Sequence, residues 1–148
     1  MRTILHFDLD AFFCAVEQRR NPALANTAFV VAGHSKERGV VATASYAARA
    51  FGIRAGTPTA RALQLCRELV VVRPDFRAYM QASRDVIELV RSEYSAVEHA
   101  SIDEAYVDIT LAPDTPAHIA RHLQQRIASE LQLSVSCGVA SNKLVAKA

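Results

Sequence analysis

Apolar residues along the chain fall into short continuous runs and into longer stretches with helical spacing. The short runs predict strands: TILHFDL (3–9), apolar on both faces, is expected to be buried, and the others are TAFVVAG (27–33), VVATAS (40–45), LVVVR (69–73) and LSVSCGVA (133–140). AYVDI (105–109) instead alternates apolar and polar positions, as a strand with one buried face does. Together these segments predict a protein built around β-sheet.

Helical spacing is clearest from Asp75 to about Glu98, where apolar residues recur at intervals of three and four between charges. They are Phe76, Tyr79, Met80, Val86, Ile87 and Val90. Further helices follow start signals at Asp10 (for 11–20), Thr57 and Pro58 (within 56–68), Thr115 and Pro116 (ending near Leu131) and Ser141. A short helix, 46–52, is closed by Gly52.

Hairpin-like strands interspersed with long helices predict an α+β fold, with helices on a mainly antiparallel sheet and a small insertion within it. The last segment, SNKLVAKA (141–148), has a helix start but no glycine or proline to end the helix. Because isolated short helices are marginal, this pattern predicts that the natural protein continues beyond residue 148.

Composition narrows the class of protein. The 148 residues, 51% hydrophobic and 22% charged, suffice for one sizeable core. No apolar run is long enough to cross a bilayer and no signal core is present, so the sequence predicts a cytoplasmic protein without a membrane partner. Cys14, Cys66 and Cys137 are odd in number and widely spaced, which indicates core residues in a reducing compartment.

Charge is distributed unevenly along the chain. Residues 36–77 carry eight basic and three acidic residues, whereas the remainder carries nine basic and twelve acidic ones. A basic segment within an acidic remainder favours contact between a polyanion and one lobe. A solvated helix surface would give the same pattern.

Two acidic pairs stand beside predicted strands: Asp8 and Asp10 end one, and Asp103 and Glu104 precede another. If these strands are neighbours in one sheet, Asp8, Asp103 and Glu104 converge. Nearby carboxylates repel unless cations neutralise them, and their oxygens favour Mg²⁺ or Mn²⁺. Two such ions about 3.5–4 Å apart suit phosphoryl displacement. Spacing alone leaves a structural role open, with the acidic pairs capping helices and lining turns.

Four segments occur in the order that characterises one family: HFDLDAFFCAVEQ (6–18), ATASYAARAFGIRAGTP (42–58), SIDEAYVDI (101–109) and GVASNKLVAKA (138–148). The chain resembles the Y-family, lesion-bypass DNA polymerases, most closely their bacterial branch, over essentially its whole length. The resemblance implies a palm formed by 1–10 and 75–148, with fingers inserted at 11–74. It also implies thumb and little-finger domains, which are absent from these 148 residues.

The resemblance assigns roles to the acidic residues. Asp8 and Asp103 match the metal-bridging aspartates, and Glu104 matches the catalytic glutamate near the primer 3′-hydroxyl. At Leu9 the family uses the backbone carbonyl as a metal ligand. Asp10 matches no metal ligand and is interpreted as a helix N-cap.

The resemblance also implies a nucleotide site. Phe13 matches the steric gate, an aromatic ring that excludes a 2′-hydroxyl, and Phe12 lies next to it, although an ordinary core position suits Phe12 better. Tyr46 and Arg49 match residues of the fingers that hold the triphosphate. Lys147 matches a lysine that reaches the triphosphate from the palm. Arg54 is either close to template or triphosphate or simply on the surface, Lys143 is expected on the surface, and His6 is expected to be structural.

The implied activity is template-directed DNA synthesis of low fidelity, in which two Mg²⁺ ions (or Mn²⁺) support transfer of a deoxynucleotide to a primer 3′-hydroxyl. Its partners would be primer-template DNA, dNTP and, for the full-length protein, a sliding clamp. The chain alone is expected to be weakly active or inactive.

Two other functions are considered. An aspartate-nucleophile phosphatase of the haloacid dehalogenase type would also end a strand in D-x-D, but it would need Thr or Ser soon after, where this chain has Ala11, Phe12 and Phe13. A non-catalytic polymerase-like scaffold would be expected to have lost acidic ligands, and all of them are present.

Overall fold

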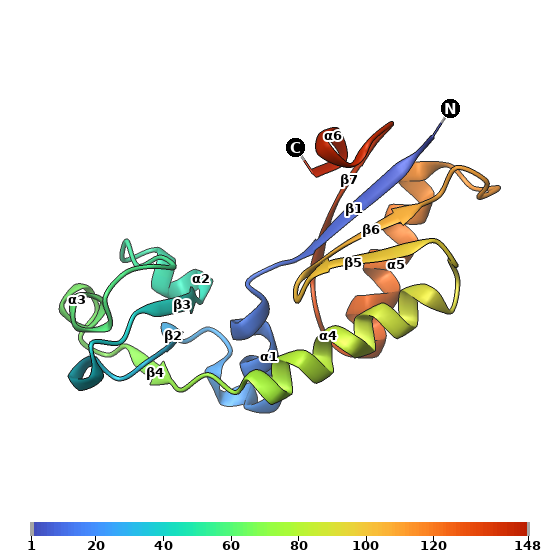
Figure 1. Ribbon diagram of the computed structural model, residues 1–148. Helices are drawn as coiled ribbons and strands as arrows, with labels where there is room; N and C mark the ends of the chain where they lie inside the picture. Colours follow the sequence, from blue (N-terminus) through green and yellow to red (C-terminus); the bar gives the residue numbers. More distant parts are fainter. Residues whose placement is uncertain (1, 148) are drawn as a thin grey trace. The chain divides into compact units, whose positions relative to one another are not determined.

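The computed structural model describes residues 2–147, apart from the side chain of Leu144 (Figure 1). The backbone divides into two compact units. The first contains the described residues among 1–10 and 79–148, and the second contains residues 11–78.

The first unit is built on a four-stranded sheet in which every neighbouring pair of strands is antiparallel. Its strands are β1 (Ile4–Leu9), β5 (Val97–Ser101), β6 (Glu104–Asp108) and β7 (Val135–Ala140), in the order β5-β6-β1-β7. The first strand of the chain therefore lies inside the sheet, between β6 and β7 (Figure 1). This position explains why TILHFDL is apolar on both faces.

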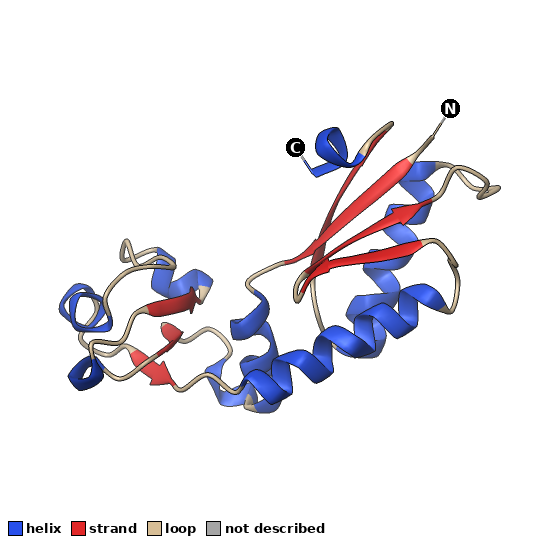
Figure 2. Ribbon diagram, in the orientation of Figure 1, coloured by secondary structure: helices blue, strands red, loops and turns tan. Residues whose placement is uncertain are grey.

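Helices occupy both faces of this sheet (Figure 2). On one face α4 (Phe76–Arg91) contacts the sheet through Ser83, whose hydroxyl is hydrogen-bonded to His99 of β5 at 3.2 Å. α5 (Pro116–Leu131) supplies Ile119, Leu123 and Ile127 to the core at intervals of four, with exposed fractions of 1% or less. Neighbouring residues of a strand point to opposite faces, so Glu104 lies on the face opposite to α4.

A short helix, α6 (Lys143–Lys147), covers part of that other face. It approaches so closely that a Cβ on Gly138 of β7 would lie 2.1 Å from the carbonyl oxygen of Ala146. Only glycine fits there. The Asn142 side chain caps this helix by accepting a hydrogen bond from the Val145 amide at 2.9 Å, so the expected cap, Ser141, was wrong.

The second unit holds a smaller sheet with the order β3-β2-β4, made of β2 (Phe29–Ala32), β3 (Val41–Ala44) and β4 (Val70–Val72). β2 pairs antiparallel with β3 and parallel with β4. Around it lie α1 (Phe12–Arg20), α2 (Tyr46–Arg49), α3 (Thr59–Leu65) and the 3₁₀ turns Pro22–Leu24 and Ser35–Glu37. Its core includes Val30, Val41, Ile53, Ala62 and Leu69.

The expected α+β fold is confirmed, but one strand was missed. The helix expected to run to about Glu98 ends at Arg91, and Val97–Ser101 forms β5. Among the strands that the structure describes, β5 pairs only with β6, so it is an edge strand, and Glu98 and His99 are exposed. An edge strand exposed on both faces carries no apolar alternation from which it could be predicted.

The apolar stripe of α4 is only partly a core stripe. Tyr79, Val86 and Val90 have exposed fractions of 1% or less, as expected, whereas Phe76 and Met80 are 56% and 51% exposed. Phe76 and Met80 are four residues apart and so lie one turn from each other on the same side of the helix. Spacing identified the stripe but not its buried portion.

Asp10 does not cap α1, contrary to expectation. Its carboxylate accepts hydrogen bonds from the hydroxyls of Ser134 and Ser136, at 2.8 and 2.6 Å. The N-cap residue is Ala11, in the left-handed conformation (φ 42°), and no side chain caps the helix. Asp10 instead ties the start of β7 to the end of β1, because the two serines offer it donors.

Of the caps expected at α5 and α3, the first is confirmed and the second is not. Thr115 caps α5 by accepting from the His118 amide at 3.2 Å, with Pro116 next, as expected. The N-cap of α3 is Pro58 rather than Thr57, because the Thr57 hydroxyl accepts a hydrogen bond from the Arg54 amide at 3.1 Å.

The cysteines behave as core residues. All are free; Cys14 and Cys66 are buried and Cys137 is half-buried. Burial raises the pKa of the Cys14 thiol to about 12 and that of Cys137 to about 11, which keeps both thiols protonated and unreactive at neutral pH. No helix within residues 2–147 has the length and apolar character needed to span a membrane.

Candidate active site

The first unit brings the predicted carboxylates to one end of its two central strands. Asp8, near the end of β1, is paired in the antiparallel register with Glu104, the first residue of β6. Residues paired in this way share a face of the sheet. The Leu9 amide donates to the Asp103 carbonyl at 2.8 Å, which fixes the turn before β6 against β1. Asp8, Asp103 and Glu104 thus gather although 95 residues separate Asp8 from Asp103 in the sequence.

The electrostatic consequence is seen at Asp8. Its pKa is raised above the usual value, first by burial and then by the negative charges of Asp103 and Glu104, while His6 acts in the opposite direction. A carboxyl group in this environment gains from any cation that approaches it.

Glu104 is held by three partners on different segments. Its Oε1 lies 3.1 Å from Nε2 of His6 and 3.1 Å from the ammonium of Lys147, and its Oε2 lies 3.1 Å from the hydroxyl of Ser101. The same hydroxyl lies 3.0 Å from Asp103. The pKa of Glu104 is lowered, first of all by the hydrogen bond from Lys147. This carboxylate stays ionised at neutral pH.

His6 and Ser101 were not identified as site residues from the sequence. His6 was interpreted as structural, and its ring is indeed 5% exposed and lies 5.0 Å from the ring of Tyr106. It also orients Glu104. The available signal was its position two residues before Asp8, which puts both side chains on one face of a strand.

The donor set fits a hard dication in its chemistry, since it consists of carboxylate oxygens whose charges repel one another. Within residues 2–147, however, no three His, Cys, Asp or Glu side chains are arranged around a common point that could hold a metal ion. The ammonium of Lys147 lies against one oxygen of Glu104, and the hydroxyl of Ser101 lies against the other.

The second unit contains the two adjacent phenylalanines. Phe12 is 4% exposed and belongs to the core, as its ordinary interpretation predicted. Phe13 is half-buried: its ring lies 5.8 Å from that of Phe12 and meets Phe76 edge-on at 5.7 Å. Aromatic neighbours therefore fix the Phe13 ring while part of it stays accessible.

Tyr46 and Arg49 form a second, cationic surface within this unit. The Arg49 guanidinium lies over the Tyr46 ring, 4.6 Å from its centroid, and its Nε donates to the Ala44 carbonyl at 3.1 Å. The Tyr46 side chain is exposed. An open recess beside them is lined by Ala42, Thr43, Ala44, Arg49, Arg54 and Ala55. Arg54, whose place the sequence left open, thus shares a surface with Arg49.

The structure therefore distributes the predicted site residues over two groups. Asp8, Leu9, Asp103, Glu104 and Lys147 belong to the first unit, and Phe12, Phe13, Tyr46 and Arg49 belong to the second. Within its own unit, each group is assembled from segments that lie apart in the sequence.

Comparison with known proteins points in one direction. The model of the impB/mucB/samB family matches residues 7–148. A DNA polymerase IV from Salmonella typhimurium is 45% identical over 150 residues, and one from Pseudomonas aeruginosa is 43% identical, each alignment covering 99% of this chain and 43% of the relative. The chain thus spans less than half the length of the curated relatives it matches.

Solved structures give the same result. A Y-family DNA polymerase chimera superposes with a TM-score of 0.92 at 34% identity, over 98% of this chain and 44% of its own. DinB from Sulfolobus solfataricus and an insertion ternary complex of Dbh DNA polymerase each give 0.90, with the same identity and coverage.

Proposed function

The chain belongs to the impB/mucB/samB family of Y-family DNA polymerases, and from this premise we propose that it carries the catalytic centre for template-directed DNA synthesis. The reaction is the transfer of a deoxynucleotide to a primer 3′-hydroxyl, with the low fidelity of lesion bypass. The observation that carries the proposal is the pairing of Asp8 with Glu104, beside Asp103, at one end of the central strands.

The unit that contains β1, β6 and β7 is assigned to the palm, and the fingers expected at 11–74 fall within the second unit, residues 11–78. This assignment puts the metal-binding carboxylates on rigid central strands and the nucleotide-binding cations on shorter elements. It also agrees with the excess of basic residues over residues 36–77, since the fingers would face polyanionic substrates.

Asp8, Asp103 and Glu104, with the backbone carbonyl of Leu9, would hold two Mg²⁺ ions, for which Mn²⁺ could substitute. When bound, such ions make a hydroxyl more acidic and offset the charge of a leaving pyrophosphate. Before that, His6 and Ser101 fix the orientation of the Glu104 carboxylate. A pre-oriented carboxylate needs less rearrangement to bind a cation.

Arg49 and Tyr46 would bind the triphosphate. The Nε of Arg49 donates to the Ala44 carbonyl, so its two terminal nitrogens would be the donors to phosphate oxygens. Phe13, supported by Phe12 and Phe76, would lie under the incoming sugar and exclude a 2′-hydroxyl by its volume. A triphosphate contact by Lys147 remains a prediction, since this lysine pairs with Glu104.

Primer-template DNA and dNTP are the proposed substrates, and a sliding clamp is the proposed partner of the full-length protein. A cytoplasmic location is part of the proposal and is supported by the three free cysteines. An aspartate-nucleophile phosphatase is not supported, because Asp10, its second aspartate, is occupied by Ser134 and Ser136.

The test is Mg²⁺-dependent primer extension by the full-length protein with Asp103→Asn. Loss of a metal ligand should lower the rate by about 1,000-fold or more, because metal-held charge stabilisation is worth several kcal/mol. Asp114→Asn, at an exposed loop position, is the control and should be unchanged. A polymerase-like scaffold would show no extension in the wild type, and full activity of Asp103→Asn would contradict the two-metal site.

A further inference from the structure

Lys147 is the distinctive member of the carboxylate cluster. Its ammonium lies 3.1 Å from Oε1 of Glu104. Among the described ion pairs of Glu104, the other partner is His6, which is charged only when protonated. Lys147 therefore supplies the permanent positive charge that touches the cluster.

This lysine and a metal ion would compete for one atom. A dication bound by Glu104 needs a lone pair of a carboxylate oxygen, and the Lys147 ammonium is hydrogen-bonded to Oε1. It also adds a positive charge beside the place where a second one would have to enter.

We propose that Lys147 is a displaceable counter-ion: it neutralises the Asp8, Asp103 and Glu104 cluster in the metal-free protein and yields its place when a divalent cation binds. The proposal rests on the metal site of the proposed function. His6 and Ser101 stay on Glu104 during the exchange, since they are hydrogen-bonding partners that orient the carboxylate rather than fixed positive charges.

The side chain of Lys147 can leave without unfolding its helix. It is 56% exposed, and an ion pair this accessible to water is worth little and is easily exchanged. α6 is held to the sheet by other contacts. Ala146 is 2% exposed and packs over Gly138. At the start of the helix, the Asn142 side chain accepts a hydrogen bond from the Val145 amide.

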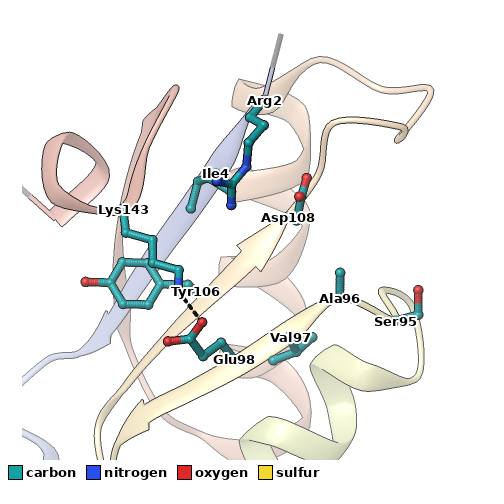
Figure 3. A pocket seen from close by; sticks show the side chains of 9 residues that line it. All are labelled: Arg2, Ile4, Ser95, Ala96, Val97, Glu98, Tyr106, Asp108 and Lys143. Atoms are coloured by element: carbon teal, nitrogen blue, oxygen red, sulfur yellow. Dashed lines mark hydrogen bonds and ion pairs between the residues drawn. The ribbon is translucent and has the colours of Figure 1, made fainter.

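Figure 3 shows a second lysine contact, on the same face of the sheet but at a recess whose lining includes none of Asp8, Asp103 and Glu104. Lys143 pairs with Glu98, and its ammonium lies 5.8 Å from the centroid of the Tyr106 ring. Lys143 and Lys147 belong to one helix, carry the same charge and each pair with a glutamate. Lys143 is thus a matched control that lies outside the carboxylate cluster.

The experiment is a titration of the purified chain with Mn²⁺ alone, followed by electron paramagnetic resonance of the free ion. Lys147→Met should tighten Mn²⁺ binding by about threefold to fivefold, because the competing ion pair is lost. Lys143→Met removes an equal charge at a distance and should leave the affinity unchanged. Lys147→Arg keeps the charge and should stay close to wild type. Lys147→Gln replaces Lys147→Met if the latter does not fold.

Thermal unfolding in EDTA gives an independent readout. Without Lys147 the carboxylates repel one another unopposed, so Lys147→Met should lower the Tm more than Lys143→Met does, and added Mn²⁺ should remove the difference. If Lys147→Met binds Mn²⁺ no more tightly than Lys143→Met, the counter-ion role is wrong while the metal site stands. If neither the wild type nor Lys147→Met binds Mn²⁺, both the metal site and this proposal are wrong.

Discussion

The carboxylate end of the β1–β6 pair and the arginine-lined recess near β3 are two charged surfaces organised in opposite ways. In the first, like charges are forced together on central strands and are restrained by buried or half-buried partners such as His6 and Ser101. In the second, Arg49 and Arg54 are exposed among small side chains, and a single backbone carbonyl orients Arg49.

The two surfaces are therefore suited to different ligands, the first to cations and the second to phosphates. Carboxylates that repel one another are stabilised when a cation binds between them. Exposed arginines instead offer hydrogen-bond donors to a phosphate. Substitutions in the first should act on metal binding and rate, with effects on the fold as well. Substitutions in the second should act on nucleotide affinity and leave the fold unchanged.

The largest effect is expected for Asp8→Asn, where function and stability should change in opposite directions. Primer extension should fall by about 1,000-fold or more. The Tm of the metal-free protein should nevertheless rise, by about 1–3 °C, because a partly buried charge facing Asp103 and Glu104 is removed. Calorimetry in EDTA beside single-turnover extension measures both; a lower Tm would show that the cluster is not repulsive.

The difference in Tm between wild type and Asp8→Asn should depend on pH. The pKa of Asp8 is raised in the folded state, so its protonation stabilises the fold, and that stabilisation is present at low pH and lost as pH rises through the folded pKa. The Tm advantage of Asp8→Asn over wild type should therefore grow from about pH 4 to neutrality. A constant difference across this range would contradict the assigned shift.

The next effect tests the arginine surface. Arg49→Ala should raise the KM for dNTP by about 10- to 100-fold, the worth of charged hydrogen bonds to phosphate, with little change in Tm. Arg61→Ala, an exposed arginine of α3, is the matched control in the same unit. Steady-state kinetics measure KM and kcat separately. A decrease in kcat with unchanged KM would show that Arg49 does not bind the nucleotide.

Phe12 and Phe13 are adjacent in the sequence but differ in burial, since Phe12 is buried and Phe13 is half-buried. Phe13→Ala should reduce discrimination against ribonucleotides by about tenfold or more with a modest effect on stability. Phe12→Ala should cost about 3–5 kcal/mol of folding free energy, because Phe12 is buried. Competitive incorporation of ribonucleotides and deoxyribonucleotides measures the first effect, and chemical denaturation measures the second. Unchanged sugar selectivity in Phe13→Ala would show that Phe13 is only a packing residue.

The smallest effect concerns His6. His6→Ala removes a partner that orients Glu104 and should weaken Mn²⁺ binding by about tenfold, the usual scale for such outer contacts. His6→Gln, which retains a donor, should restore most of the affinity. If Gln and Ala behave alike, His6 serves only the packing against Tyr106.

Much of this arrangement was predictable from the sequence. Acidic residues at the ends of apolar runs predicted the meeting of Asp8 with Asp103 and Glu104, because strand ends that share an edge bring their side chains together. The resemblance of four ordered segments predicted the family, which the family model confirms. Buried periodic segments such as α5 were found with their caps.

What escaped prediction depends on register and on three-dimensional partners. β5 is exposed and polar, so only its pairing with β6 defines it. Asp10 was assigned to the nearest helix, whereas its partners, Ser134 and Ser136, lie more than 120 residues away. The contacts of His6 and Lys147 with Glu104 also join separate elements, β1, β6 and α6, so they could not be predicted from the sequence alone.

Paramagnetic broadening of the amide NMR resonances by substoichiometric Mn²⁺ tests the central claim most directly. We predict that the amides of Leu9, Asp103 and Glu104 broaden first, and that Asp103→Asn abolishes this broadening while Asp114→Asn does not. Broadening that spares the ends of β1 and β6, or that persists unchanged in Asp103→Asn, would contradict it.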